Sequence, residues 1–213
     1  MGIAKDTFTN IYARKMWGAE GKFNSGSGSR DPSLVNPYLT SVTQFLSSFK
    51  DKPSIVDLGC GDFTVGSKLR QYCSQYIACD IVEELITYNK KAYAEYDVDF
   101  RILDMEADAL PNGTICIIKQ VLQHLSNSII LSIIPKLYIY KYILITEHLP
   151  IGKFIANLDH PVSGNIRAGA IHSGIVLTEP PFKLKVVDEK VLCELQSCGG
   201  RIQTKLYCLT ESL

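Results

Sequence analysis

The chain has 213 residues, of which 46% are hydrophobic and 21% are charged. This length and balance are typical of one globular domain that folds without a metal or disulfide, and they exclude a disordered or collagen-like chain. Its 22 basic residues balance its 22 acidic residues, which argues against a protein that binds nucleic acid through phosphate neutralisation.

We expect neither a targeting segment nor a metal site. Residues 1–10 lack the apolar run of a signal peptide. Charged residues interrupt the most apolar stretch, 129–145, so no membrane span is expected. The seven cysteines include no Cys-x-x-Cys pair, which disfavours zinc and favours a reducing, cytoplasmic location.

Short apolar runs alternate with segments of helical spacing between residues 54 and 146. The runs are apolar nearly throughout, and strands of that kind are covered on both faces, which predicts a parallel α/β sheet. Strands are expected over 54–58, 75–80, 98–103, 114–118 and 138–146. Helices are expected over 37–49, 65–72, 81–94 and from the N-cap residue Ser126 to the residue before Pro135.

Two segments lack such periodicity. Residues 24–30, Asn-Ser-Gly-Ser-Gly-Ser-Arg, impose little backbone preference, which fits a plain linker and a lid over a site equally well. Residues 149–182 contain four prolines and four glycines. Such a long irregular segment is usually functional or disordered, and we expect it to contact substrate. Lys183–Val187 and Ile202–Leu209 are expected to form a closing pair of strands, with Glu179–Phe182 as a rigid turn before them.

Candidate binding residues follow the first three expected strands, where open parallel sheets bind ligands. Gly59 and Gly61 permit a tight turn after Asp57, which could anchor a cation or brace the loop; an ordinary strand-to-helix turn fits equally well. Asp80 lies 21 residues after Gly59, at the tip of the second strand. A carboxylate there can bind a ribose diol, and a helix-capping role is compatible with this.

The third strand is followed by Asp104 and Met105, which could bind an adenine amine and flank its ring. With the glycine turn and Asp80, these residues make the chain resemble the class I S-adenosylmethionine-dependent methyltransferases, well over about residues 33–148. The resemblance implies a Rossmann-like three-layer α/β/α sandwich: a mostly parallel seven-stranded sheet with an antiparallel last strand. Phe63 departs from the family, which often has a third glycine there.

The resemblance also implies S-adenosylmethionine as the cofactor, with Asp57 and the glycine turn facing its methionine part. The expected cofactor-binding residues are Asp57, Gly59, Cys60, Gly61, Asp80, Ile81, Asp104, Met105, Gln120 and Trp17. The N-terminal segment 1–36 of this single domain is expected to cover the cofactor and acceptor. Trp17 then forms a cleft wall or, equally well, anchors that segment to the core.

Candidate residues for the acceptor lie near the same edge. His124 follows the fourth strand, and with a pKa near neutrality it could take a proton from a hydroxyl; a packed structural histidine fits equally well. His148, at the end of the fifth strand, is a second candidate base. The expected substrate contacts are Tyr12, Arg30, Arg167 and His172.

The predicted function is therefore methyl transfer to a hydroxyl or amine of a small-molecule or sugar-containing acceptor, without nucleic acid or membrane partners. Lys119–Leu122 stands where amino-methylating nucleic-acid enzymes carry an Asp/Asn-Pro-Pro-aromatic motif. One alternative is a nicotinamide-dependent oxidoreductase, which needs a third glycine that Thr64 does not supply. Another is a non-catalytic protein that keeps the cofactor fold for binding.

Overall fold

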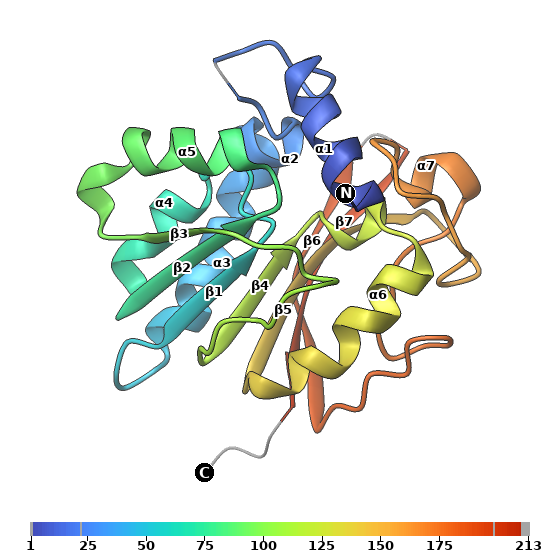
Figure 1. The fold of residues 1–213 in the computed structure, drawn as a ribbon. Helices are drawn as coiled ribbons and strands as arrows, with labels where there is room; N and C mark the ends of the chain where they lie inside the picture. The colour runs from blue at the N-terminus through green and yellow to red at the C-terminus, as the bar shows by residue number, and fades with distance from the viewer. Residues whose placement is uncertain (1, 22, 198, 210–213) are drawn as a thin grey trace.

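The computed structural model describes residues 2–21, 23–197 and 199–209. Its centre is a seven-stranded sheet with the strand order β3-β2-β1-β4-β5-β7-β6 (Figure 1). β1 to β5 are parallel, and β7 runs antiparallel to both β5 and β6. The predicted fold class is confirmed. The strands are β1 (Ser54–Leu58), β2 (Gln75–Asp80), β3 (Asp99–Ile102), β4 (Ile115–Lys119), β5 (Tyr142–Pro150), β6 (Asp188–Ser197) and β7 (Gly200–Cys208).

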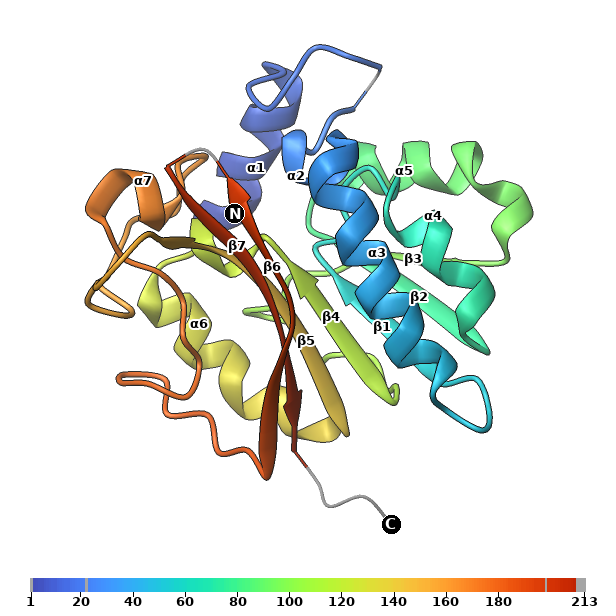
Figure 2. The ribbon, with the colours of Figure 1, turned by 180° about the vertical axis from the view of Figure 1, so that it is seen from behind.

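Helices cover both faces of the sheet. In β4, Cys116 and Ile118 belong to the apolar cluster that includes α6 (Asn127–Ile133), whereas Ile115 and Ile117 belong to the cluster that includes α3 (Pro32–Ser47). Figure 1 shows α6 in front of one face, and Figure 2 shows α3 and α4 in front of the other. Because successive residues of a strand point to opposite faces, two covered faces require the continuous apolar runs seen in the sequence.

The remaining helices are short. They are α1 (Ile3–Ala13), α2 (Ser27–Arg30), α4 (Gly66–Leu69), α5 (Glu83–Ala92), α7 (Arg167–Ile171) and the 3₁₀ turns η1 (Arg70–Tyr72), η2 (Ala94–Tyr96), η3 (Leu122–His124) and η4 (Ile134–Ile139). Among the described residues, no helix has both the length and the apolar composition needed to cross a membrane.

α3 begins five residues earlier than expected, because two start signals precede the apolar spacing. The side chain of Asp31 accepts a hydrogen bond from the Ser33 backbone N–H at 2.9 Å. Pro32 occupies the first helical position, where its missing N–H costs no hydrogen bond. The helix therefore runs from the N-terminal segment directly onto the sheet.

Two strand predictions were wrong at their boundaries. β5 begins at Tyr142 rather than 138, because residues 134–139 form η4. The strand expected over Lys183–Val187 does not form there; β6 begins at Asp188, which pairs with Cys208 of β7. Lys183 has a left-handed φ of 48° and donates its N–H to the Glu179 carbonyl at 3.1 Å, so it closes the expected turn instead of extending.

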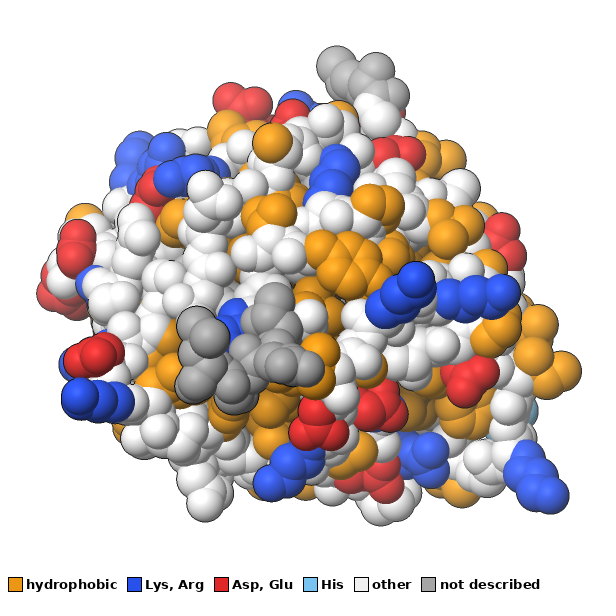
Figure 3. Space-filling model, turned by 90° about the horizontal axis from the view of Figure 1, so that it is seen from below, with side chains coloured by type: hydrophobic (Ala, Val, Ile, Leu, Met, Phe, Trp, Pro, Cys, Tyr) orange, Lys and Arg blue, Asp and Glu red, His pale blue; other side chains and the backbone are white. Residues whose placement is uncertain are grey.

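The two ends of the parallel strands differ. α1 lies across their carboxyl ends, at the top of Figure 1. Figure 3 views the molecule from below, at the opposite end, where acidic and basic side chains are interspersed around an apolar area. The features that carry chemistry lie under α1.

Candidate functional site

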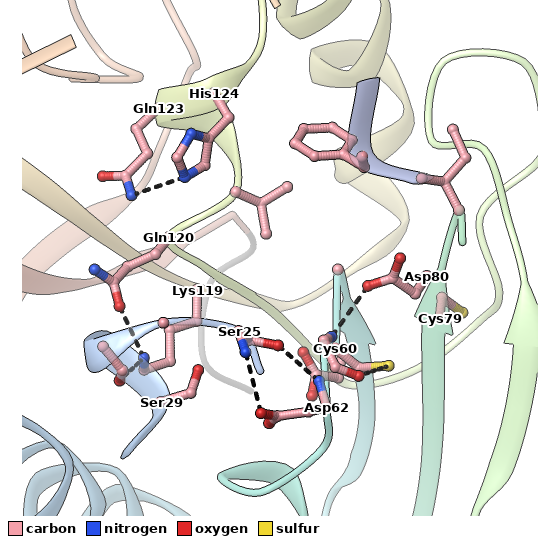
Figure 4. Close-up of a pocket in the computed structure, with 18 of the residues that line it drawn as sticks. Ser25, Ser29, Cys60, Asp62, Cys79, Asp80, Lys119, Gln120, Gln123 and His124 are labelled. Atoms are coloured by element: carbon pink, nitrogen blue, oxygen red, sulfur yellow. Dashed lines mark hydrogen bonds between the residues drawn. The ribbon is translucent and has the colours of Figure 1, made fainter. Parts of the chain in front are cut away.

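A cavity of about 300 Å³ lies at the carboxyl ends of β1, β2 and β4. β1 sits between β2 and β4, so the strand order reverses beside it, which is where doubly wound sheets bind ligands. Figure 4 shows Asp80 and Cys60 on one side of the cavity, with Lys119, Gln120 and His124 across from them. α1 and residues 25–29 supply the rest of the lining.

The glycine turn requires glycine for two reasons. Gly59 and Gly61 have left-handed φ angles of 78° and 57°. A Cβ on Gly59 would lie 2.5 Å from a Val121 methyl group, and one on Gly61 would lie 2.5 Å from the Ser25 hydroxyl. The turn therefore brings its backbone close to the chain segments on either side of the cavity.

Phe63 has the same left-handed backbone, with a φ of 59°. This conformation explains why glycine suits the position in the family that the sequence resembles. The Phe63 ring is fully buried and packs edge-on against Phe100, with ring centroids 4.9 Å apart. Aromatic packing thus accompanies the strained backbone, and the turn keeps its shape without the third glycine.

Asp80 is buried and braces the turn. Its carboxylate accepts hydrogen bonds from the backbone N–H of Gly61 at 3.0 Å and of Val82 at 3.1 Å. Burial raises the pKa of Asp80 to about 6. The backbone N–H of Ile81 also acts on this carboxylate. A carboxylate has about four acceptor positions, so acceptor capacity remains for a ribose hydroxyl. The alternative role as a helix cap is not what the structure shows, because Val82 is the residue that flanks the start of α5.

Asp57 also lines the cavity and is buried. It accepts a hydrogen bond from the Tyr76 hydroxyl at 2.8 Å, and burial raises its pKa to about 7. The acidic loop after β3 forms a further wall, which includes Ile81 and Met105. Lys136 holds this loop by donating from Nζ to the Met105 carbonyl at 2.9 Å. Asp104 lies in the same wall.

Residues 25–30 are bonded to the glycine turn through Asp62. The Ser25 backbone N–H donates to Asp62 at 3.1 Å, and the Asp62 N–H donates to the Ser25 hydroxyl at 2.8 Å. The Arg30 guanidinium forms an ion pair with Asp62 at 3.0 Å. The Tyr12 hydroxyl lies 2.9 Å from the Ser25 hydroxyl. From the sequence, residues 24–30 fitted a linker and a lid equally well. In the structure this Ser-Gly segment lies against the cavity, which residues 25–29 line.

Lys119 ends β4 inside the cavity. Its Nζ donates to the Gly28 carbonyl at 2.6 Å and to Gln120 Oε1 at 3.0 Å. Burial lowers the pKa of Lys119 to about 8. Gln120 has a left-handed φ of 56°, and its side chain lies where a Cβ on Gly28 would be. Gly28 is therefore required for the close approach of the Ser-Gly segment to the end of β4.

His124 is a neutral histidine with a defined tautomer. Its Nδ1 lies 3.1 Å and 3.2 Å from the carbonyl oxygens of Ser163 and Asn165, which can only accept hydrogen bonds. Nδ1 therefore carries the proton, and Nε2 is the acceptor. Burial lowers the pKa of His124 to about 4, so the expectation of a value near neutrality was wrong. The ring lies beside Trp17, with centroids 5.2 Å apart.

A buried network holds the turn that carries His124. The Glu147 carboxylate accepts hydrogen bonds from the backbone N–H of Leu122 at 3.1 Å and of Gln123 at 3.0 Å. The Gln123 side-chain oxygen accepts from the His148 N–H at 3.0 Å. His148 lines the cavity, its Nε2 has no hydrogen-bond partner among the described residues, and burial lowers its pKa.

All ten expected cofactor residues line the cavity, as do Tyr12, His124 and His148. Arg30, Arg167 and His172 do not. Arg167 is fully buried and donates to the carbonyls of Leu125 and Leu158, so it braces backbone. His172 is exposed, with Nε2 3.3 Å from the Lys153 carbonyl. The structure therefore does not bring these two residues to the cavity.

Sequence reasoning missed several residues of the site. They are Ser25, Tyr38, Asp62, Lys119 and Gln123, which line the cavity, and Glu147 behind it. Lys119 carried a signal, because it is a charged residue that ends an otherwise apolar run. Asp62 directly follows the glycine turn but is distant in sequence from Ser25 and Arg30, so its contacts leave no local pattern.

Comparisons with known proteins agree with this geometry. Residues 56–131 match the family model described as a methyltransferase domain. The juvenile hormone acid O-methyltransferase of Bombyx mori is 36% identical over 58 residues, an alignment that spans 25% of this chain and 21% of that protein. The chain thus matches about a fifth of the length of this curated relative.

Solved structures share the fold across nearly the whole chain. The N-methyltransferase NodS from Bradyrhizobium japonicum WM9, in complex with S-adenosyl-L-homocysteine, has a TM-score of 0.69 at 12% identity, covering 95% of this chain and all (100%) of that one. Magnesium protoporphyrin IX methyltransferase from Synechocystis PCC 6803, with bound SAM, gives 0.61 at 14% identity and 98% coverage of both chains. Human N-acetylserotonin methyltransferase, in complex with SAM, gives 0.60 at 18% identity, covering 97% and 60%. The predicted resemblance to class I methyltransferases is confirmed.

Proposed function

We propose that this chain, whose residues 56–131 match the methyltransferase domain family, is an enzyme that transfers a methyl group from S-adenosylmethionine to a small-molecule acceptor. The single observation that carries the proposal is the cavity beside β1, where the Gly59–Gly61 backbone and the buried Asp80 carboxylate face one space. The relatives named above are methyltransferases, and three structures with this fold contain the methyl donor or its demethylated product.

The residues present fit the cofactor. Asp80 keeps acceptor positions free for the ribose hydroxyls, and the Gly61 position leaves no room for a side chain. Ile81 and Met105 give an apolar wall for the adenine ring, with Asp104 beside it for the exocyclic amine. Asp57 and the glycine-turn backbone take the methionine part in this arrangement.

When bound, S-adenosylmethionine supplies a methyl group already activated by the sulfonium charge. The task of the protein is then to align the acceptor, exclude water and accept a proton where the acceptor is a hydroxyl. In our proposal, His124 accepts that proton at Nε2, the unprotonated ring nitrogen. In the structure Nε2 accepts a hydrogen bond from the Gln123 side-chain amide at 3.4 Å, so a bound acceptor replaces this contact. The proposal also gives the N-terminal segment the role of cover, since residues between Ala4 and Ser29 line the cavity, and gives residues 149–182 the acceptor side, since Gly164 and Ile166 line it.

The acceptor class is the finer part of the proposal: a hydroxyl or amine of a small or sugar-containing metabolite. Incubation of the protein with isotope-labelled methyl donor and fractionated metabolites, followed by mass spectrometry, identifies it. We expect binding of S-adenosylmethionine and S-adenosylhomocysteine by calorimetry and a labelled product in at least one fraction. Binding of a nicotinamide dinucleotide, with no binding of either methyl-donor form, would overturn the proposal.

A further inference from the structure

Lys119 is a cation inside the cavity without a contacting anion. Its ammonium group is bonded to two neutral oxygens, the Gly28 carbonyl and Gln120 Oε1. The ion pairs among the described residues do not include it. A buried charge is costly unless it is paired, so an ammonium in a ligand cavity with no contacting anion indicates a ligand that supplies the opposite charge.

The three acids whose charges act on Lys119 are Asp57, Asp62 and Glu147, and each is already engaged elsewhere. Asp57 accepts from the Tyr76 hydroxyl, and Asp62 accepts from Arg30 and from the backbone of Ser25. Glu147 accepts from two backbone N–H groups of η3. None of them provides the counterion of Lys119.

A second, independent observation lies beside the first. Tyr38 of α3 lines the cavity, is 3% exposed, and its hydroxyl has no hydrogen-bond partner among the described residues. Lys119 Nζ lies 5.4 Å from the centroid of the Tyr38 ring. Ser29, next to Gly28, also lines this part of the cavity (Figure 4). An ammonium, a free hydroxyl and a serine are the donors that a carboxylate accepts from.

We propose that Lys119 and Tyr38 form a carboxylate-binding corner of the cavity. The inference rests on the proposed function for the origin of the ligand: the carboxylate belongs to the amino-acid end of the cofactor or to the acceptor. In both cases the Lys119 ammonium neutralises the carboxylate, and the Tyr38 hydroxyl donates a hydrogen bond that orients it. One end of the bound molecule is then held at this corner, and its other end lies beside His124 or Asp80.

The experiment compares wild type with Lys119→Met and Tyr38→Phe in two calorimetric arms. The first arm titrates S-adenosylhomocysteine and its decarboxylated analogue. The second titrates hexanoate and hexanamide, with and without S-adenosylhomocysteine. If the cofactor supplies the carboxylate, Lys119→Met weakens S-adenosylhomocysteine about 10- to 100-fold, as expected for a lost charged hydrogen bond, and leaves the decarboxylated analogue unchanged. Tyr38→Phe does the same by about 3- to 10-fold.

If the acceptor supplies the carboxylate, both cofactor analogues keep their affinity, and the preference of wild type for hexanoate over hexanamide disappears in Lys119→Met. The matched control is Lys141→Met. Lys141 directly precedes β5 and does not line the cavity, and its Nζ lies 5.5 Å from the Tyr142 ring centroid. Lys141→Met should leave the affinities measured in both arms unchanged.

The two proposals fail separately. If wild type binds S-adenosylhomocysteine and every variant keeps the same preference for the carboxylate ligand, the carboxylate-binding corner is contradicted and the proposed function stands. Wild type that binds neither methyl-donor form overturns the proposed function. The hexanoate arm without cofactor still tests the corner in that case, because a preference for hexanoate that depends on Lys119 supports it and equal binding contradicts it.

Discussion

Asp62 and Ser25 are hydrogen-bonded to each other in both directions. The Ser25 N–H donates to the Asp62 carboxylate, and the Asp62 N–H donates to the Ser25 hydroxyl. The pair joins the N-terminal segment to the glycine turn across 37 positions of sequence. Because the segment lines the cavity while the turn forms its floor, opening the cavity on this side requires breaking this pair.

Asp62→Ala should loosen residues 25–30. The change removes the acceptor of Ser25 and the ion-pair partner of Arg30, and hydrogen bonds to a charged group contribute about 1.5–3 kcal/mol each. We expect faster hydrogen exchange in this segment and about tenfold faster dissociation of S-adenosylhomocysteine, measured by stopped flow. Asp97→Ala is the control, because Asp97 pairs with Arg70 but is 96% exposed. If hydrogen exchange in residues 25–30 is unchanged in Asp62→Ala, Asp62 does not hold this segment against the glycine turn.

Asp80→Ala should weaken cofactor binding by about 1.5–3 kcal/mol, because two ribose hydroxyls lose a charged acceptor. The bonds from Gly61 and Val82 are lost as well, so the variant also tests the turn. Asp80→Asn separates the two effects, since its amide oxygen keeps one backbone bond but loses the charge. Calorimetry checks both variants. If Asp80→Ala binds the cofactor with unchanged affinity, Asp80 only supports the glycine turn and does not bind the ribose.

The sequence predicted those parts of the site that follow from local pattern. Asp57 and Asp80 lie at the carboxyl ends of short apolar runs and Gly59 follows the first of these runs, so their meeting at one edge follows from the parallel sheet. Lys119 and Tyr38 come together only through the packing of α3 beside β4, which no spacing encodes. The start of β6 was misplaced because Lys183–Val187 looks extended, whereas pairing with β7 begins at Asp188.

Arg167 should matter for stability rather than for acceptor binding. Its buried guanidinium donates to two backbone carbonyls and, at 2.9 Å, to the Asn127 side chain. Arg167→Ala leaves these acceptors unsatisfied, so the free energy of unfolding should fall by about 3 kcal/mol or more in urea denaturation. His172→Ala, on the exposed surface, should change it by less than about 0.5 kcal/mol. A stable Arg167→Ala protein with a raised acceptor KM would restore the substrate role expected from sequence.

The low pKa of His124 predicts acid sensitivity. Its folded-state pKa of about 4 lies below the 6.5 of an unperturbed histidine, so between these values the unfolded chain binds more protons. Stability then falls as pH falls through this range, by up to about 3 kcal/mol. Burial raises the pKa of Asp57, Asp80 and Glu147. These three carboxyl groups therefore make the free energy of unfolding rise, not fall, as pH falls.

The contribution of His124 is therefore measured as the difference between wild type and His124→Gln in urea denaturation from pH 7 to pH 4. The glutamine amide can donate to the same carbonyls but does not titrate. The variant should gain stability relative to wild type as pH falls. A difference that stays constant with pH would contradict the lowered pKa.

The same substitution tests the chemical step. In our proposal, Nε2 of His124 accepts the proton of a hydroxyl acceptor, so His124→Gln should slow kcat by roughly 10²–10⁴-fold. The lower end is expected, because a group with a pKa of about 4 is a weak base at neutral pH.

Cofactor affinity of His124→Gln should hardly change, because Asp80 and the glycine turn remain. The acidic limb of kcat/KM should lie near pH 4 in wild type and be absent from the variant. His148→Gln is the matched comparison, since His148 lines the same cavity and its Nε2 has no hydrogen-bond partner among the described residues. If His148→Gln loses the rate and His124→Gln keeps it, His148 is the base; if both keep it, alignment of the acceptor carries the reaction without a base.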